Sequence, residues 1–250
     1  DHLFDFMSRR YSPQNMVFSA SGKVEHQRVV DMVAEKFDSL PPHEEHAFEP
    51  LKYEGGSRIE NRKLEQVHVI FGLPTVSYTH DSFFDLQVFN TLLGGGMSSR
   101  LFQEIREKRG LVYSVYSFSS HYVDGGLFSI YAGTGANDIG ELMPVMCDEL
   151  VRATEDLSEE EVKRARAQLK ASVVMAMESN SGRCETLARQ IQIFGRPQSM
   201  EEIVAKVDAV DLESVRRAGK ALLDGKPTIT ALGPVDKMPE YDDLAARLRK

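Results

Sequence analysis

The chain has 250 residues, of which 42% are hydrophobic and 27% are charged, and its formal net charge is −8. This composition is ordinary for a globular protein and supplies enough apolar surface for one large domain or two small ones. The acidic balance, with lysines and arginines interleaved among acids, argues against a nucleic-acid-binding protein, because no basic stripe is available to contact phosphates.

The two cysteines, Cys147 and Cys184, lie in helical patterns and match neither a disulfide framework nor a redox pair. No stretch approaches the roughly 18 apolar residues that a membrane span needs, and no signal peptide is found. We therefore expect no membrane-spanning segment, reduced thiols and a cytoplasmic location.

The beginning and the end of the chain share one order of elements. Each has a helix with two adjacent arginines, a short turn, a strand ending in glycine, and a second helix. The strand covers residues 16–25 in the first case and residues 228–236 in the second. Gly22 then corresponds to Gly233, 211 residues later (233 − 22). We interpret this as an internal repeat, although strand–turn–helix endings are common enough for a chance match.

The repeat predicts how the chain is divided. Residues 1–40 would be the tail of a preceding half, residues 41–52 a proline-containing linker, and residues 53–250 a complete second half. By the same logic, about 160 or more residues of an earlier copy would precede residue 1.

Within residues 53–250, strand patterns come in blocks and helical patterns come in blocks. This order predicts an α+β fold, with an antiparallel sheet that helices cover on one side. The expected strands are residues 65–74, 111–119, 126–133 and 228–236, and the expected helices are 81–93, 99–109, 137–155, 158–178, 183–194, 199–206, 212–223 and 241–248.

Several residues are typical of helix ends. Ser98 or Ser99 is expected to cap the helix over residues 99–109, and Gly110 to end it. Ser158 opens a capping-box pattern. The three glycines of residues 94–96 follow a helix and precede no lysine, so a backbone kink fits them better than a phosphate-binding loop. A nucleotide-binding α/β protein is accordingly a remote alternative.

The histidines do not form a zinc-binding motif. None of the seven lies in His-Glu-x-x-His or His-x-x-Glu-His, the orders that place two imidazoles and a carboxylate on one helix face. The segment over residues 43–46, His-Glu-Glu-His, is one residue short and lies in the expected linker. We expect no metal site in this chain.

Arg106 and Tyr113 lie on either side of the glycine that ends the second helix. Taken singly, the arginine would favour a helix C-terminus and the tyrosine would be a packing residue. Together, a guanidinium and a phenol can both donate hydrogen bonds to a carbonyl oxygen that becomes negative when water attacks it.

The sequence from Leu93 to Tyr113, LGGGMSSRLFQEIREKRGLVY, resembles the signature of the C-terminal half of pitrilysin/insulinase-family zinc metallopeptidases. The processing-peptidase-like branch is the most similar. In that family two α+β halves face each other across a peptide-holding chamber, and only the first binds zinc. The resemblance implies that Arg106 and Tyr113, seven residues apart like the family's pair, bind the substrate.

The resemblance therefore implies the substrate-binding C-terminal part of a zinc metalloendopeptidase. Zinc would belong to the parent enzyme, and this chain alone would bind none and be inactive. Its partners would be a peptide substrate and an N-terminal zinc-bearing half in cis, or a partner subunit in trans, with a dimer as a further option. The alternative is a non-catalytic partner or scaffold subunit of a processing-peptidase-like complex.

Overall fold

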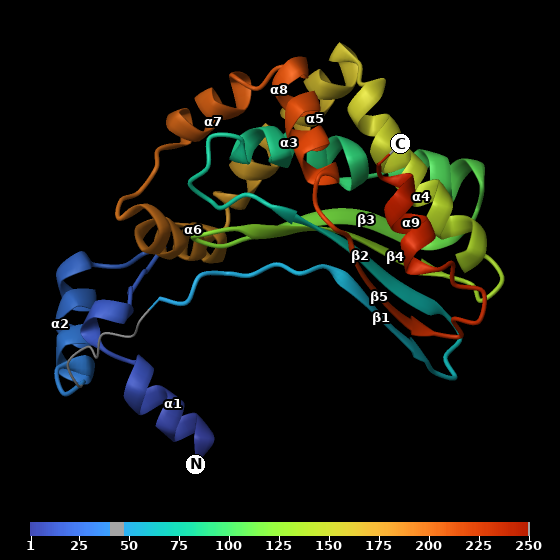
Figure 1. The fold of residues 1–250 in the computed structure, drawn as a ribbon. Helices are drawn as coiled ribbons and strands as arrows, with labels where there is room; N and C mark the ends of the chain where they lie inside the picture. The colour runs from blue at the N-terminus through green and yellow to red at the C-terminus, as the bar shows by residue number, and fades with distance from the viewer. Residues whose placement is uncertain (41–47, 250) are drawn as a thin grey trace. The chain divides into compact units, whose positions relative to one another are not determined.

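The computed structural model describes residues 1–40 and 48–249. They form two compact units: Asp1–Pro50 with Ser172–Met200, and Leu51–Ala171 with Glu201–Lys250. The second, larger unit contains the sheet drawn in Figure 1 and holds all of the residues expected to bind a substrate.

Five strands form one sheet in the larger unit, in the spatial order β1-β5-β2-β4-β3. The pairs β5–β2, β2–β4 and β4–β3 are antiparallel, whereas β1 pairs with β5 in parallel. The expected antiparallel sheet is thus found, with one parallel pair at its edge. The strands are β1 (Gly56–Asn61), β2 (Val67–Thr75), β3 (Val112–His121), β4 (Gly126–Thr134) and β5 (Thr228–Gly233).

The sequence pattern does not predict β1. Its only large apolar residue is Ile59, which is exposed, so there is no alternation to recognise. β1 forms because it pairs with β5 along its whole length. The preceding Tyr53 fixes this edge, since its hydroxyl donates to the carbonyl oxygen of Lys226 at 2.7 Å.

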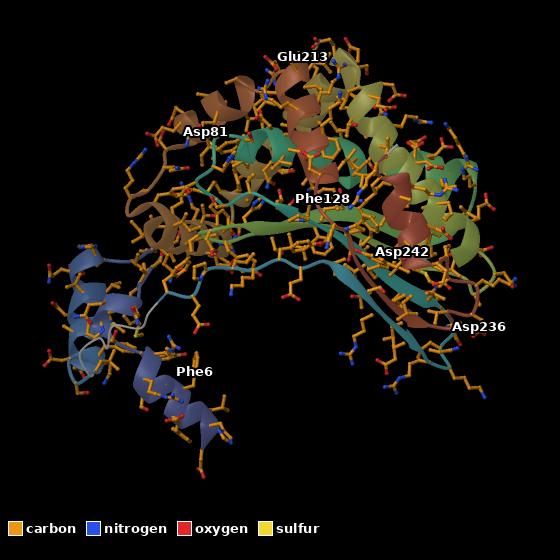
Figure 2. All side chains as sticks on the ribbon, in the orientation of Figure 1. Phe6, Asp81, Phe128, Glu213, Asp236 and Asp242 are labelled. Carbon is orange, nitrogen blue, oxygen red and sulfur yellow. The ribbon has the colours of Figure 1, made fainter. Side chains whose placement is uncertain are left out.

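Helices cover one side of the sheet, which confirms the predicted α+β fold (Figure 1). α3 packs on β3 and on α8, and α4 packs on α8 and α9. Phe128 of β4, labelled in Figure 2, points towards the helices. It and Phe89 of α3 are fully buried, with ring centroids 6.1 Å apart. The helices of this layer are α3 (Phe83–Gly94), α4 (Ile139–Glu155), α8 (Leu212–Leu223), α9 (Tyr241–Arg247) and the π-helix η2 (Phe102–Lys108).

The chain passes from one unit to the other within two helices, α5 (Glu159–Ala176) and α7 (Met200–Asp208). α5 begins with the predicted capping box. The amide of Glu161 donates to Ser158 Oγ at 3.3 Å, and the amide of Ser158 donates to Glu161 Oε2 at 3.1 Å.

The smaller unit contains α1 (His2–Arg10), the 3₁₀ turn η1 (Pro13–Asn15), α2 (His26–Phe37) and α6 (Asn180–Phe194). The strand expected over residues 16–25 pairs with no strand among residues 1–40 and 48–249. The thiol of Cys184 donates to the carbonyl oxygen of Ser19 in this segment at 3.0 Å. The predicted division at residues 1–40, 41–52 and 53–250 follows the repeat rather than these units, and it stays a prediction.

Candidate functional site

Arg106 lies on a π-helix rather than on the α-helix that the sequence predicts. The helix starts at Arg100 and widens to π geometry over Phe102–Lys108. It then ends at Gly110, whose φ of +66° confirms the predicted stop. The amide of Leu111 donates back to the carbonyl oxygen of Ile105 at 3.0 Å, which closes the wide last turn. π-Helical segments occur frequently at functional sites.

The serine cap expected at the start of this helix is not formed. Ser99 accepts the amide of Gln103 through its backbone carbonyl, at 3.0 Å, whereas its buried Oγ has no hydrogen-bond partner among the described residues. Arg100 anchors the helix instead. Its Nε and Nη2 reach Glu161 of α5 at 2.6 and 2.8 Å, and its Nη1 donates to Asp156.

This anchor is a mostly buried ion pair. Burial alone would lower the pKa of Arg100, but hydrogen bonds to Glu161 and Asp156 outweigh it and raise the pKa. Burial likewise raises the pKa of Glu161, and Arg100 and Ser158 more than reverse that effect, so the pKa falls to about 2. The bidentate pair therefore stays charged and ties the helix of Arg106 to α5.

Tyr113 lies at a β-bulge near the start of β3. Val112 is opposite Thr134 and Ser114 is opposite Gly133, so Tyr113 is an extra residue without a partner on β4. Its side chain is 77% exposed. Bulges re-aim side chains and are over-represented beside active sites.

The two irregular segments bring Arg106 and Tyr113 together. Arg106 Cζ lies 5.6 Å from the centroid of the Tyr113 ring and 4.7 Å from that of Phe102. Both distances are within the range of cation–π attraction. The guanidinium is thus held by two aromatic rings, and within the described part of the chain it makes no hydrogen bond or ion pair. Its N–H donors are available to a ligand.

The neighbouring cations of the same helix are used differently. Lys108 Nζ and Arg109 Nη2 lie 2.7 and 3.1 Å from the carboxylate of Glu104. The hydrogen bond from Lys108, followed by that from Arg109, holds the pKa of Glu104 below its usual value. Because Glu104 is occupied by these two cations, it does not neutralise Arg106.

The three glycines allow close packing rather than phosphate binding. A Cβ on Gly94 would lie 2.3 Å from the backbone nitrogen of Ser117 on β3, and one on Gly95 would lie 2.6 Å from the carbonyl oxygen of Thr91. Gly94 thus lets α3 contact β3, the strand that carries Tyr113, and Gly95 lets the chain turn against the last turn of α3. The turn expected from the sequence is therefore explained by close backbone contacts.

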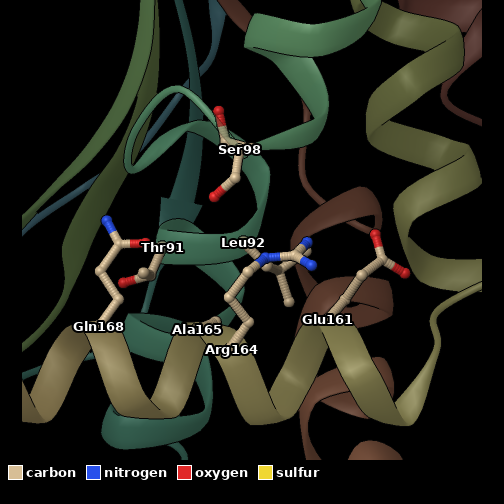
Figure 3. Close-up of a pocket in the computed structure, with 8 residues that line it drawn as sticks. Thr91, Leu92, Ser98, Glu161, Arg164, Ala165 and Gln168 are labelled. Atoms are coloured by element: carbon tan, nitrogen blue, oxygen red, sulfur yellow. The ribbon is translucent and has the colours of Figure 1, made fainter.

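A small polar crevice lies beside this turn, between α3 and α5 (Figure 3). Gln168 Nε2 donates to the carbonyl oxygen of Gly95 at 2.7 Å across it. The space for water is about 10 Å³, which holds about one water molecule and no peptide side chain. The lining residues are Thr91, Leu92, Ser98, Ser99, Glu161, Arg164, Ala165 and Gln168.

The described residues do not fit a zinc ion. Among residues 1–40 and 48–249 there is no group of three His, Cys, Asp or Glu side chains that could hold a metal. The near-motif over residues 43–46 lies outside the described residues. His121 is buried, donates from Nδ1 to the carbonyl oxygen of Val76 at 2.7 Å, and has its pKa lowered by burial.

The sequence patterns did not single out Phe102 or the aromatic residues on the open face of the sheet, of which Tyr116 is exposed and Tyr131 is half-buried. Tyr116 and Tyr131 lie opposite each other on the face without helices, with ring centroids 5.1 Å apart. The spacing of valines and tyrosines could have indicated the bulge. Val112 and Val115 are both buried, and Tyr113 and Tyr116 are both exposed. Residues three apart lie on opposite faces of a regular strand, and one extra residue in a bulge brings them to the same face.

Both cysteines are free, and burial raises the pKa of the Cys147 thiol to about 12. Every helix in residues 1–40 and 48–249 is too short or too polar to cross a bilayer.

Comparison with known proteins identifies relatives over nearly the whole chain. An "uncharacterized zinc protease" of Streptomyces coelicolor is 35% identical over 258 residues, covering 99% of this chain and 55% of the relative. One from Rickettsia bellii is 34% identical (94% and 57%), and YmxG of Bacillus subtilis, also called an uncharacterized zinc protease, is 30% identical (96% and 59%). The chain thus spans a little over half the length of these relatives.

A solved structure has the same fold. A chain of complex III2 from Candida albicans, bound to Inz-5, matches with a TM-score of 0.80 and 18% identity, covering 91% of this chain and 57% of that one. The sequence profile described as "Peptidase M16 inactive domain" matches residues 1–169. The motif over residues 93–113, the α+β fold with helices on one side of the sheet, and this match together show that the chain belongs to the peptidase M16 family.

Proposed function

We propose that this chain is the substrate-binding part of a zinc metalloendopeptidase that cleaves peptides in a closed chamber. The zinc site would lie on an N-terminal half of the same protein or on a partner subunit. The names of the relatives, which are zinc proteases, support the parent activity. The two free thiols fit a reducing compartment, and the proposal places the protein in the cytoplasm.

One observation supports the substrate-binding role above all. Arg106 is fixed between two aromatic rings, with its donors unused by the described residues, beside an exposed phenol raised on a bulge. A guanidinium held in this way loses little conformational freedom when it donates to a peptide carbonyl. Tyr113 adds an O–H donor close to it. Both donors would strengthen as the carbonyl oxygen gains negative charge.

The test uses the complete enzyme with a fluorogenic peptide. Arg106→Ala is expected to lower kcat/KM on the order of 10²-fold, and Tyr113→Phe to lower it less, because each removes a donor to the reacting carbonyl. Zinc content, measured by atomic absorption, should stay unchanged in both variants.

The control variants are Arg109→Ala and Tyr122→Phe. Arg109 lies on the same helix and is paired with Glu104, and Tyr122 is an exposed tyrosine just after β3. Neither should change kcat/KM by more than a few fold. Unchanged cleavage in Arg106→Ala and Tyr113→Phe alike would leave the scaffold alternative, since a purely structural subunit does not need these two donors. The 250-residue chain alone is expected to show no peptidase activity.

A further inference from the structure

Glu104 is a buried carboxylate on the π-helix that carries Arg106. The residue is 8% exposed and lies two positions before the arginine. Burying a charged group is costly unless partners compensate for the water that it loses. Within the described part of the chain, no hydrogen bond or ion pair joins Glu104 to Arg106. The role of this charge therefore lies in the other contacts that Glu104 makes.

The two oxygens of Glu104 bind two residues of its own helix. Oε2 accepts from Lys108 Nζ at 2.7 Å, and Oε1 accepts from Arg109 Nη2 at 3.1 Å and from Arg109 Nε at 3.3 Å. These partners lie four and five positions further along the chain. The side-chain neighbours of a residue on an α-helix are three and four positions away, whereas a π turn closes from residue i to residue i+5. Contacts to the fourth and the fifth residue together fit a π turn better than an α turn.

The backbone has the same wide turn, and the following strand is fixed. The amide of Leu111 donates to the carbonyl oxygen of Ile105 at 3.0 Å, six residues earlier. β3 begins one residue after Leu111 and is held by its ladder to β4. A π turn contains about one residue more than an α turn. If the turn narrowed, Arg106 would rotate relative to the fixed strand, and its guanidinium would leave the ring of Tyr113.

The ion pairs of Glu104 contribute little to the stability of the fold. The side chains of Lys108 and Arg109 are 65% and 42% exposed, so water screens both pairs. Partly buried ion pairs are in general weak stabilisers, and the fixing of one geometry is their best-attested use. π-Helical turns are also rare. A carboxylate that bridges such a turn selects its geometry.

We propose that Glu104 is a positioning residue for Arg106. Its two oxygens hold Lys108 and Arg109 in the π turn, and this turn keeps the guanidinium beside the Tyr113 ring. The inference rests on the proposed substrate-binding role of Arg106 and adds a residue to it. Glu104 itself contacts no substrate and acts through the arginine.

Steady-state kinetics of the complete enzyme with a fluorogenic peptide tests the effect on turnover. Glu104→Gln should lower kcat about tenfold and leave KM within about twofold, because a misplaced donor loses mainly its contact with the transition state. Its Tm should stay within about 3 °C of that of the parent. Unchanged kcat in Glu104→Gln, with Arg106→Ala on the order of 10²-fold slower, would overturn this inference and leave the proposed function standing.

Glu107→Gln is the matched control. Glu107 is a carboxylate on the same helix, one residue after Arg106, and it is exposed. Because it does not bridge the turn, its substitution should leave kcat and KM unchanged. An equal loss of kcat in Glu107→Gln and Glu104→Gln would show that the charge of the helix matters rather than the bridge, which contradicts the proposal.

A double-mutant cycle separates positioning from a general structural role. If Glu104 acts through the guanidinium, Glu104→Gln should change kcat by less than about twofold in the Arg106→Ala background. A further tenfold loss in that background would mean that Glu104 acts independently of Arg106, and the proposal would fall.

Removing the two cations provides an independent variant should Glu104→Gln fail to fold. Lys108→Gln combined with Arg109→Gln should lower kcat about tenfold, as the loss of the carboxylate does. Arg109→Ala alone keeps the bond between Lys108 and Glu104 and therefore stays within a few fold of the parent. Parent-like kcat in the combined variant would contradict the bridge.

Fluorine NMR tests the geometry without any measurement of activity. Tyr113 is replaced by meta-fluorotyrosine in the complete enzyme, and Arg106→Ala gives the resonance of a ring without its cation. Glu104→Gln should move the resonance towards that position, and Glu107→Gln should leave it in place. An unmoved resonance in Glu104→Gln would overturn the inference whatever Arg106 binds. A moved resonance supports the role of the bridge even if Arg106→Ala leaves cleavage unchanged, a result that would refute only the proposed function.

Discussion

The two faces of the sheet are built from alternate residues of the same strands, yet they have opposite roles. On the covered face Phe71 lies opposite Ile130, and both are fully buried under the helices. On the other face their neighbours Ile70 and Tyr131 lie opposite each other, and Ile70 is 41% exposed. A one-residue step along a strand thus separates a position that stabilises the fold from one that can contact a ligand.

The exposed face is nevertheless organised. His68 Nδ1 and the Tyr131 hydroxyl lie 2.8 Å apart, and Tyr116 contacts both Tyr131 and Phe118. Aromatic side chains present large contact areas and lose little rotamer entropy when they bind. In this unit, therefore, burial on the covered face of the sheet determines the stability of the fold. The aromatic side chains of the open face take no part in the core and can contact a ligand.

The largest expected effect separates the two faces on one strand. Phe71→Ala should lower the free energy of unfolding by about 3–5 kcal/mol, because it removes a fully buried ring and leaves a cavity. Ile70→Ala, one residue away on the open face, should cost less than about 1 kcal/mol. Urea unfolding followed by circular dichroism measures both. Similar losses would show that the open face is covered in solution.

The second effect concerns the helix layer and pH. Because Arg100 and Ser158 hold the folded pKa of Glu161 at about 2, below an unfolded value of about 4.3, the pair stabilises the fold above pH 5. That stability should be lost as the pH falls from about 5 towards 2. Its size is on the order of 2–3 kcal/mol, since the Glu161 side chain is only 19% exposed.

Glu161→Gln is the matched control for this titration. The variant should be less stable than the parent at pH 7 and should lose less stability between pH 5 and pH 2. The measurement is urea unfolding at a series of pH values. Parallel pH profiles for the two proteins would mean that another carboxylate controls acid unfolding.

The smallest effect is that of a substitution on the covered side of the sheet that should stabilise the fold rather than destabilise it. Glu149 of α4 is buried, its Oε2 has no hydrogen-bond partner within the described residues, and burial raises its pKa against the pull of Arg152. The carboxylate is therefore costly in its charged form, and stability should rise as the pH falls through its folded pKa.

Glu149→Gln should raise the free energy of unfolding at pH 7 by less than about 1 kcal/mol. The substitution removes the cost of a buried charge, and the ion pair that is lost contributes little because the Arg152 side chain is 49% exposed. The gain should vanish at low pH, where the parent carboxyl is neutral. A loss of more than about 1 kcal/mol at pH 7 would instead show that the pair with Arg152 stabilises the fold.

Regular elements were predicted well wherever periodicity was strong. The helix expected over residues 137–155 is α4 (Ile139–Glu155), and the strand expected over residues 126–133 is β4 (Gly126–Thr134). β1 was missed because edge pairing creates it, and the strand expected over residues 16–25 lacks partners in the described residues. Periodicity reports burial on one face, so it fails where pairing rather than burial defines the element.

The sequence predicted the two residues of the candidate site, the glycine between them and their convergence on one carbonyl oxygen, and the role of the pair stays a prediction. The sequence did not predict the backbone geometry that brings the two side chains together. Regular geometry of a helix and a strand would give no reason for Arg106 and Tyr113 to meet; a π-helix and a β-bulge provide it. Phe102, which holds the guanidinium from the other side, became apparent only with the coordinates.

The sequence by itself determined most of the helices and strands, the family motif and the two residues of the candidate site, because these depend on local periodicity and on residue type. Tertiary structure alone decided which side chains of the sheet are exposed, that Lys108 and Arg109 neutralise Glu104, and that Arg106 keeps its donors free of partners among the described residues. Those outcomes depend on which distant residues come within a few ångströms of one another, and local sequence patterns do not carry that information.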